Sequence, residues 1–228
     1  MILMEHPLFM DYGPIPGIAI FAVLMAVSGG FFSYQVIKAT RLVRLGKPDN
    51  RFDNWGARIS EVITGWLGQK KVLKDRVAGG IHVMMFWGFL MLSTDMFDLA
   101  TGNWFSHNLL PEVLNGPWNI MVEFGYFIAF IGCTLALIRR TIFTPDKLKG
   151  KSQIEGNAIL MLIMTITTTA FVVEAGESGV SKTWEPIGYW VAQTIIPSTT
   201  MVVVAYWAHM LAIATFLFLI PVSKHMHL

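Results

Sequence analysis

Five long apolar stretches run through this chain, separated by polar segments in which its basic residues gather. Each stretch is long enough to cross the hydrocarbon core of a bilayer as a helix, which takes about 20 residues. We place the spans near residues 15–38, 78–100, 117–138, 156–175 and 197–220. The pattern predicts an all-α fold: a polytopic membrane protein in which a five-transmembrane-helix bundle forms a single domain over residues 1–228.

Composition supports this interpretation and excludes several other classes of protein. Of the 228 residues, 54% are hydrophobic and only 14% are charged, which excludes an ordinary soluble domain. The single cysteine, Cys133, lies inside an apolar stretch, so this chain offers no Cys-based zinc or iron–sulfur site. No phosphate-binding loop or nucleic-acid signature appears. Because Glu5 and no basic residue precedes the first apolar stretch, we expect that stretch to be retained and not cleaved as a signal peptide.

The basic residues predict the orientation of the spans. Of the 17 Lys and Arg residues, ten fall within residues 38–76, five within residues 139–151, and one is Lys224. Only Lys182 lies in the other set of connections. By the positive-inside rule, the N-terminus is then outside and the C-terminus cytoplasmic, in a multi-pass protein of the cytoplasmic (inner) membrane.

The first cytoplasmic connection, residues 39–77, contains an amphipathic pattern. Six apolar residues fall on one face at helical spacing, opposite Arg58, Glu61 and Gln69; they are Trp55, Ile59, Val62, Ile63, Trp66 and Leu67. The pattern predicts a helix that lies in the membrane interface. The basic residues that follow would bind either anionic membrane lipids or an acidic partner surface, and the sequence favours neither. They are Lys70, Lys71, Lys74 and Arg76.

Four of the six histidines lie on the second and fifth spans or just beyond them. His82 lies about one turn inside the cytoplasmic end of the second span, and His225 and His227 follow the cytoplasmic end of the fifth. His209 lies 12 residues before Pro221, about 18 Å into the membrane and on the order of 10 Å deeper than His82. One haem iron needs two ligands at one depth. We therefore predict a b-type haem between His82 and a terminal histidine. The haem-free alternative has His82 bonded to a backbone carbonyl and the terminal pair solvated.

Other residues near these histidines have two interpretations each. Gly80 and Gly88 open space on the helix of His82, either for a haem or for a neighbouring helix. Asp95 and Glu123 lie deep enough in the outer half that an ionisable side chain points to proton handling. Asp98, nearer the outer boundary, is expected to lie at the wet surface.

Four motifs carry a resemblance to a known family. They are the second-span segment at residues 80–89, the loop at 46–53, the turn at 68–71 and the ending at 220–227. Together they resemble the membrane cytochrome b domain related to the gamma subunit of respiratory nitrate reductase. The branch they resemble is found with heterodisulfide-reductase-like iron–sulfur proteins and electron-transfer-flavoprotein:quinone oxidoreductases. The resemblance covers essentially the whole chain. It implies five transmembrane helices, haem b between the second and fifth, and electron exchange between a quinone pool and a cytoplasmic iron–sulfur partner.

The same resemblance assigns the haem ligands. His82 matches the ligand at the start of the second helix, and His209 and His227 match the pair on the fifth. A cytoplasmic haem held by His82 and His227 is therefore implied. His225 is then either the true ligand in place of His227 or a partner of a haem propionate.

His209 is left with two roles. Relatives carry another histidine about three turns further along the second helix, where residues 91–93 of this chain hold none. His209 either ligates a second haem, with Met91 as the other ligand, or binds the quinone, which we prefer. Quinone chemistry couples electrons to protons, so the pocket needs a proton-exchanging group, and Asp95, Glu123 and His209 are the candidates.

These inferences predict the haem b subunit of a membrane oxidoreductase complex. It would pass electrons between menaquinone or another quinone and a heterodisulfide-reductase-like iron–sulfur protein, which in many relatives is fused to this domain. Two alternative functions remain. A proton-conducting protein that uses Asp95, Glu123 and His209 would leave His82 and the terminal histidines unexplained. A cofactor-free membrane anchor would only hold a redox partner in place.

Overall fold

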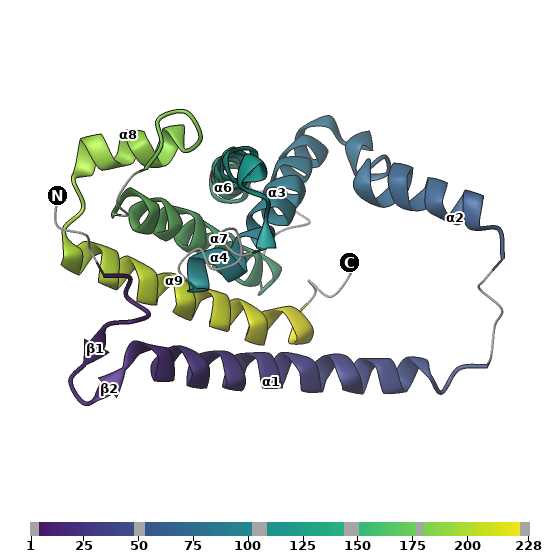
Figure 1. The fold of residues 1–228 in the computed structure, drawn as a ribbon. Helices are drawn as coiled ribbons and strands as arrows, with labels where there is room; N and C mark the ends of the chain where they lie inside the picture. Colours follow the sequence, from purple (N-terminus) through teal and green to yellow (C-terminus); the bar gives the residue numbers. More distant parts are fainter. Residues whose placement is uncertain (1–4, 48–52, 102–108, 144–150, 177–179, 224–228) are drawn as a thin grey trace.

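The computed structural model describes residues 5–47, 53–101, 109–143, 151–176 and 180–223. Five of the helices in these residues are long and apolar enough to cross a membrane (Figure 1). They are α1 (Gly17–Val43), α3 (Arg76–Thr94), α6 (Glu112–Thr141), α7 (Lys151–Gly176) and α9 (Thr199–Leu219). The predicted helical fold with five spans is confirmed.

Shorter elements connect and cover these helices. They are the two-stranded hairpin β1 (Asp11–Tyr12) and β2 (Ile15–Pro16), then α2 (Trp55–Glu61), the π-helix η1 (Val62–Leu67), the 3-10 helix η2 (Val72–Lys74), α4 (Met96–Thr101), α8 (Pro186–Ile195) and the 3-10 helix η4 (Ile220–Val222). The second span differs from its prediction, because α3 ends at Thr94 and the chain restarts as α4 after Asp95.

Side-chain caps fix where the two histidine-bearing helices begin. Asp75 accepts a hydrogen bond from the backbone N–H of Ala78 at 3.0 Å, at the start of α3. Ser198 accepts one from the backbone N–H of Met201 at 3.3 Å, at the start of α9. Each cap satisfies an N–H group that has no partner within its own helix.

Helices α3 and α6 pack closely through small residues. A Cβ added at Gly88 would lie 2.6 Å from the backbone nitrogen of Ala129, and one added at Gly125 would lie 2.6 Å from the Cβ of Met91. These distances leave no room for a side chain, so the backbones approach as small residues allow. Residue numbers rise on one helix as they fall on the other, which makes the pair antiparallel.

Other contacts set the directions of the remaining spans. The rings of Tyr126 and Phe171 join α6 to α7, with centroids 5.8 Å apart, and α7 packs against α9. Helix α1 runs alongside α9 in the same direction (Figure 1), and the rings of Phe31 and Phe218 lie 4.9 Å apart. We call the side where α1, α6 and α9 end and α3 and α7 begin the basic end, because the Lys- and Arg-rich segments adjoin it. The side of the membrane that the basic end faces stays a prediction.

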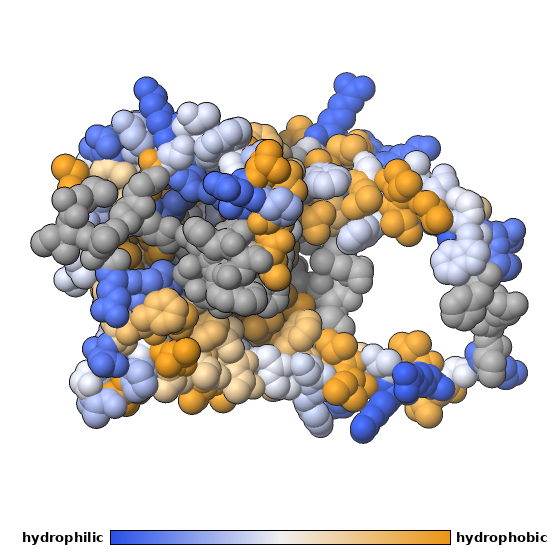
Figure 2. All heavy atoms as spheres, in the orientation of Figure 1, coloured by the Kyte–Doolittle hydropathy of each residue, from blue (hydrophilic) through white to orange (hydrophobic). Residues whose placement is uncertain are grey.

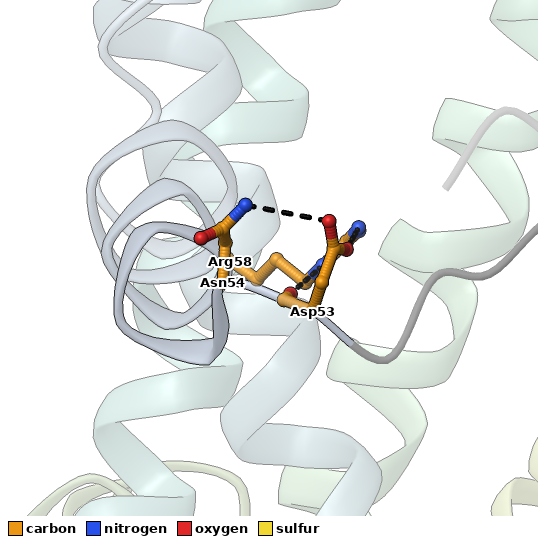
Figure 3. Close-up of polar contacts among 3 residues, drawn as sticks. All are labelled: Asp53, Asn54 and Arg58. Atoms are coloured by element: carbon orange, nitrogen blue, oxygen red, sulfur yellow. Dashed lines mark hydrogen bonds and ion pairs between the residues drawn. The ribbon is translucent and has the colours of Figure 1, made fainter.

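The predicted amphipathic helix is present as α2 and η1. It begins where Arg58 donates hydrogen bonds to Asp53 through Nε to the backbone oxygen (2.7 Å) and through Nη2 to the carboxylate (2.6 Å), beside Asn54 in the left-handed region at φ 51° (Figure 3). Five of the six apolar side chains predicted for one face are exposed, with Trp55 58% and Ile63 55% accessible, and Leu67 is half-buried. Figure 2 shows orange, apolar side chains on this segment, across an open space from α1. Its interfacial location stays a prediction.

Candidate functional site

A cavity of about 100 Å³ lies among α3, α4, α6, α7 and α9. Most of its wall is apolar, and the rings of Phe89 on α3 and Phe216 on α9 stand 5.4 Å apart at this wall. Three polar side chains interrupt the apolar lining: His209, Tyr126 and Ser93. The Ser93 hydroxyl donates to the carbonyl of Phe89 at 2.6 Å. His209 and Tyr126 are therefore the lining groups that could exchange a proton or form a hydrogen bond with a bound molecule.

His209 is held in one ring orientation by α7. Its side chain is 1% exposed, and Nδ1 lies 3.0 Å from the carbonyl oxygen of Ile166 and 3.1 Å from Oγ1 of Thr169. A carbonyl oxygen only accepts hydrogen bonds, so Nδ1 must carry the hydrogen and donate it. Among the described residues, both hydrogen bonds of the ring are made by Nδ1. The neutral ring therefore presents Nε2 as an acceptor, an assignment that follows from the bonding partners.

One contact between α3 and α9 sets their relative depth, because Phe89 meets Phe216 and the two helices run antiparallel. A second contact joins α9 to α4, where the hydroxyl of Tyr206 donates to the backbone oxygen of Ala100 at 3.0 Å. His82 lies seven residues before Phe89, so it comes level with Ser223, which lies seven residues after Phe216.

In this register the two histidines of the described spans lie far apart. His209 comes level with Met96, and at helical rise His82 lies about 21 Å from that level along the helices. This is about twice the separation expected from the sequence, because the predicted ends of the two spans do not lie at one level. His82 and His209 cannot bind one iron. His225 and His227 lie outside the described residues, so their pairing with His82 stays a prediction.

The burial of the carboxylates in the outer half differs from the prediction. Asp95 caps the end of α3, is half-buried, and accepts a hydrogen bond from the hydroxyl of Tyr126 at 2.9 Å. Asp98, expected at the wet surface, is 1% exposed. Asp98 lies on α4, after the break at Asp95, and not on a continuation of α3 as the prediction assumed.

Glu123 faces away from the cavity and toward α8. Its two oxygens accept hydrogen bonds from the backbone N–H groups of Gly188 (2.6 Å) and Ile187 (3.1 Å), in the first turn of that helix. A carboxylate at a helix N-terminus satisfies N–H groups that have no intrahelical partner. A Cβ added at Gly188 would also touch the Glu174 side chain, so a second carboxyl group lies beside the first. Glu123, 2% exposed, thus holds α8 in place, and its proton-handling role stays a prediction.

The two glycines proposed to make room for a cofactor have different surroundings. Gly88 packs against α6, as described above, whereas a Cβ added at Gly80 would meet nothing within 4 Å. Met91, considered as an iron ligand, also faces α6, because its Cβ is the atom that Gly125 accommodates. The methionine that lines the cavity with His209 is Met96.

Three residues of the site, Tyr126, Met96 and Thr169, were not predicted from the sequence. The contacts between helices bring Tyr126 and Met96 to the cavity and Thr169 to His209. His6 is half-buried, with its ring edge-on to that of Tyr206 and the centroids 5.0 Å apart, and Tyr206 lies one turn before His209. His107 lies outside the described residues. Within the described residues, no group of three or more His, Cys, Asp or Glu side chains could hold a metal ion.

The cavity volume tests the cofactors that the sequence suggests. A cavity of about 150 Å³ holds one benzene ring, so a cavity of about 100 Å³ admits less than one whole ring unless its lining side chains move. A porphyrin needs several times that space, and the residues around His209 do not fit a haem. Their chemistry suits one edge of a quinone ring: an aromatic wall, one acceptor nitrogen and a hydroxyl group.

Two curated relatives match this chain over most of its length. "Probable iron-sulfur-binding oxidoreductase FadF" of Bacillus subtilis (strain 168) is 26% identical over 227 aligned residues, covering 92% of this chain and 31% of the relative. "EtfAB:quinone oxidoreductase" of Syntrophomonas wolfei subsp. wolfei (strain DSM 2245B / Goettingen) is 26% identical over 230, covering 90% and 31%. This chain spans about a third of the length of both. No family model and no solved structure matches it. The chain is therefore similar to part of two oxidoreductases.

Proposed function

We propose that this protein is a haem b membrane subunit that passes electrons between a quinone pool and a cytoplasmic iron–sulfur partner. The names of its relatives support both ends of that path, since one is iron–sulfur-binding and the other is a quinone oxidoreductase. The observation that carries the proposal is the apolar cavity whose wall presents His209. Menaquinone or another quinone would place its ring there.

The haem belongs at the opposite end of the same helix pair. His82 is level with Ser223, and the residues that follow Ser223 include His225 and His227. We propose His82 and His227 as the axial ligands, with His225 as the alternative to His227. This end is the basic end, which the positive-inside rule assigns to the cytoplasm, where the iron–sulfur partner would bind. The haem, when bound, supplies one-electron transfer between quinone and partner.

The residues of this chain have separate tasks at the quinone. His209 accepts a hydrogen bond or a proton through Nε2, because its Nδ1 is occupied by the carbonyl of Ile166. The rings of Phe89 and Phe216 hold the quinone ring and exclude water. A dry pocket strengthens the hydrogen bond to Nε2, since the effective dielectric is lower than in water.

An absorption difference spectrum tests the haem. The dithionite-reduced minus oxidised spectrum of the purified protein should show the alpha band of a b-type haem. His82→Ala and His227→Ala should each remove that haem, whereas His225→Ala and the control His107→Ala should retain it. Loss in His225→Ala with full retention in His227→Ala would reverse the two terminal histidines. A spectrum without a b-type band in the parent protein would leave the cofactor-free anchor as the better function.

A second measurement tests the quinone site. Tryptophan fluorescence should be quenched on titration with a short-chain menaquinone analogue, and His209→Ala should weaken that binding about tenfold or more while retaining the haem. A hydrogen bond to a group left unpaired in an apolar pocket is worth about 1–3 kcal/mol, consistent with this loss. Two haems per chain in a pyridine haemochrome assay would contradict the quinone assignment of His209. A proton leak in liposomes that is independent of quinone would favour the proton-conducting alternative.

A further inference from the structure

We propose that Tyr126 and Asp95 form the proton outlet of the His209 cavity, which deepens the proposed function and rests on it. Tyr126 lines the cavity, and its hydroxyl group donates to Oδ2 of Asp95 at 2.9 Å. Tyr126 is 3% exposed, whereas Asp95 is half-buried at the end of α3 opposite the basic end. One hydrogen bond therefore connects a buried wall of the cavity to a carboxylate at the edge of the protein.

The other groups near the cavity do not offer such a path. Toward the basic end the wall continues with Phe216, Leu217 and Ile220, which carry no exchangeable side-chain proton. The Ser93 hydroxyl donates to a backbone carbonyl of its own helix. Glu123, one turn before Tyr126 on the same face of α6, does not line the cavity, and both of its carboxylate oxygens accept hydrogen bonds from the backbone of α8.

Oxidation of one quinol breaks two O–H bonds, leaves a quinone, and releases two protons and two electrons. The electrons go one at a time toward the iron–sulfur partner, or in an assay to two equivalents of ferricyanide. One proton is accepted by Nε2 of His209. The other is accepted by the Tyr126 oxygen while the hydroxyl proton of Tyr126 passes to the Asp95 carboxylate, so Tyr126 ends unchanged. Asp95 then releases its proton to solvent. In the direction of quinone reduction the same groups deliver it.

Isosteric variants separate proton transfer from shape. Tyr126→Phe removes only the hydroxyl oxygen, and Asp95→Asn keeps an acceptor oxygen but cannot take up the proton. Asp95→Glu restores a carboxylate. The matched controls are Tyr206→Phe, another buried tyrosine, which donates to a backbone oxygen, and Glu112→Gln, an exposed carboxylate at the same end of the protein.

Each variant is measured in proteoliposomes with a short-chain menaquinol and ferricyanide. Proton relay by a positioned group contributes about 10²–10⁴-fold to a rate, so Tyr126→Phe and Asp95→Asn should each slow quinol oxidation about 100-fold. The double variant should be no slower than the singles, because both interrupt one path. Asp95→Glu should recover most of the rate, and both controls should retain it. Menaquinone binding and haem content should change less than threefold throughout.

Infrared difference spectra supply a readout other than rate. On oxidation and reduction, a protonated-carboxyl band that shifts in D₂O should appear in the parent protein and be lost in Asp95→Asn. Rates within twofold of the parent in both isosteric variants would overturn the relay and leave the quinone site standing. Slow turnover with equal loss of quinone binding, or failure of Asp95→Glu to recover, would also overturn it in favour of a structural role. If the parent protein binds no quinone, the proposed function itself fails.

Discussion

The two glycines on α3 allow a sharp test of how the second span packs. Gly88→Ala places a methyl group about 2.6 Å from the backbone nitrogen of Ala129 and 2.8 Å from its Cβ, closer than real contacts allow. Helices α3 and α6 must then separate. Gly80→Ala, eight residues earlier on the same helix, meets nothing within 4 Å. The two substitutions share chemistry and helix and differ only in what the new methyl group touches.

The expected difference follows from two opposing effects. Alanine is more favourable than glycine in a helix by about 1 kcal/mol, a gain common to both variants. Overpacking costs about 1–3 kcal/mol, and only Gly88→Ala incurs it. The difference in free energy of unfolding between the variants is therefore about 1–3 kcal/mol, since the helix preference cancels. For a chain of this size, each kcal/mol moves the melting midpoint by about 2–4 °C.

Thermal unfolding in one detergent, followed by circular dichroism, measures this difference. Gly80→Ala should melt at or above the parent midpoint, and Gly88→Ala should melt below Gly80→Ala. Equal midpoints would refute the close α3–α6 packing inferred from Gly88 and Ala129. The same samples test the cofactor role predicted for Gly80, because a haem against this surface would be displaced. Haem content should then fall in Gly80→Ala, and because a bound haem stabilises the folded state, melting midpoints are compared with that of the haem-free parent.

Three smaller predictions concern helix ends. Glu123→Ala should lower the unfolding free energy by about 1–3 kcal/mol, because two N–H groups of α8 lose their acceptor, while Glu123→Gln should lose less; thermal unfolding distinguishes them. Ser198→Ala removes the cap of α9 and should cost about 1 kcal/mol in the same assay, with Thr199→Ala as the neighbouring control. Arg58→Ala breaks an exposed ion pair with Asp53 and should lower the free energy of unfolding by less than about 1 kcal/mol. A larger loss would mean that residues 53–58 are packed more firmly than their exposure indicates.

The spans could be predicted because their physical cause is local. A helix in hydrocarbon must be about 20 residues long and apolar, and the sequence displays that pattern without reference to other segments. The ends were less accurate, since they depend on caps and proline placement. The predicted fifth span, near residues 197–220, agrees with α9 within two residues because Ser198 caps its start. The first was placed five residues short of Val43, because α1 continues past Lys38 with Arg41 in its last turn and ends at the C-cap Arg44.

The arrangement between helices could not be predicted from one helix at a time. Depth along a single span follows from rise per residue, but the relative depth of two spans depends on their side-chain contacts. Phe89 with Phe216 fixes that offset, and nothing in the apolar pattern distinguishes these phenylalanines from their neighbours. The break at Asp95 is similar, because the residues that follow are apolar enough to continue the helix.

The register would place the two proposed sites on one transfer path along α3 and α9. The His209 cavity and the level of His82 are separated by about 21 Å along the same pair of helices. Electrons that leave a quinol at the cavity would move toward the basic end, whereas the proton taken by Tyr126 and Asp95 would leave at the opposite end. If the basic end faces the cytoplasm, electrons move inward while a proton is released outward, and the reaction carries charge across the membrane. The proposed function therefore requires quinol oxidation to respond to membrane potential, because each charge moved across the full membrane changes the free energy by about 2.3 kcal/mol per 100 mV.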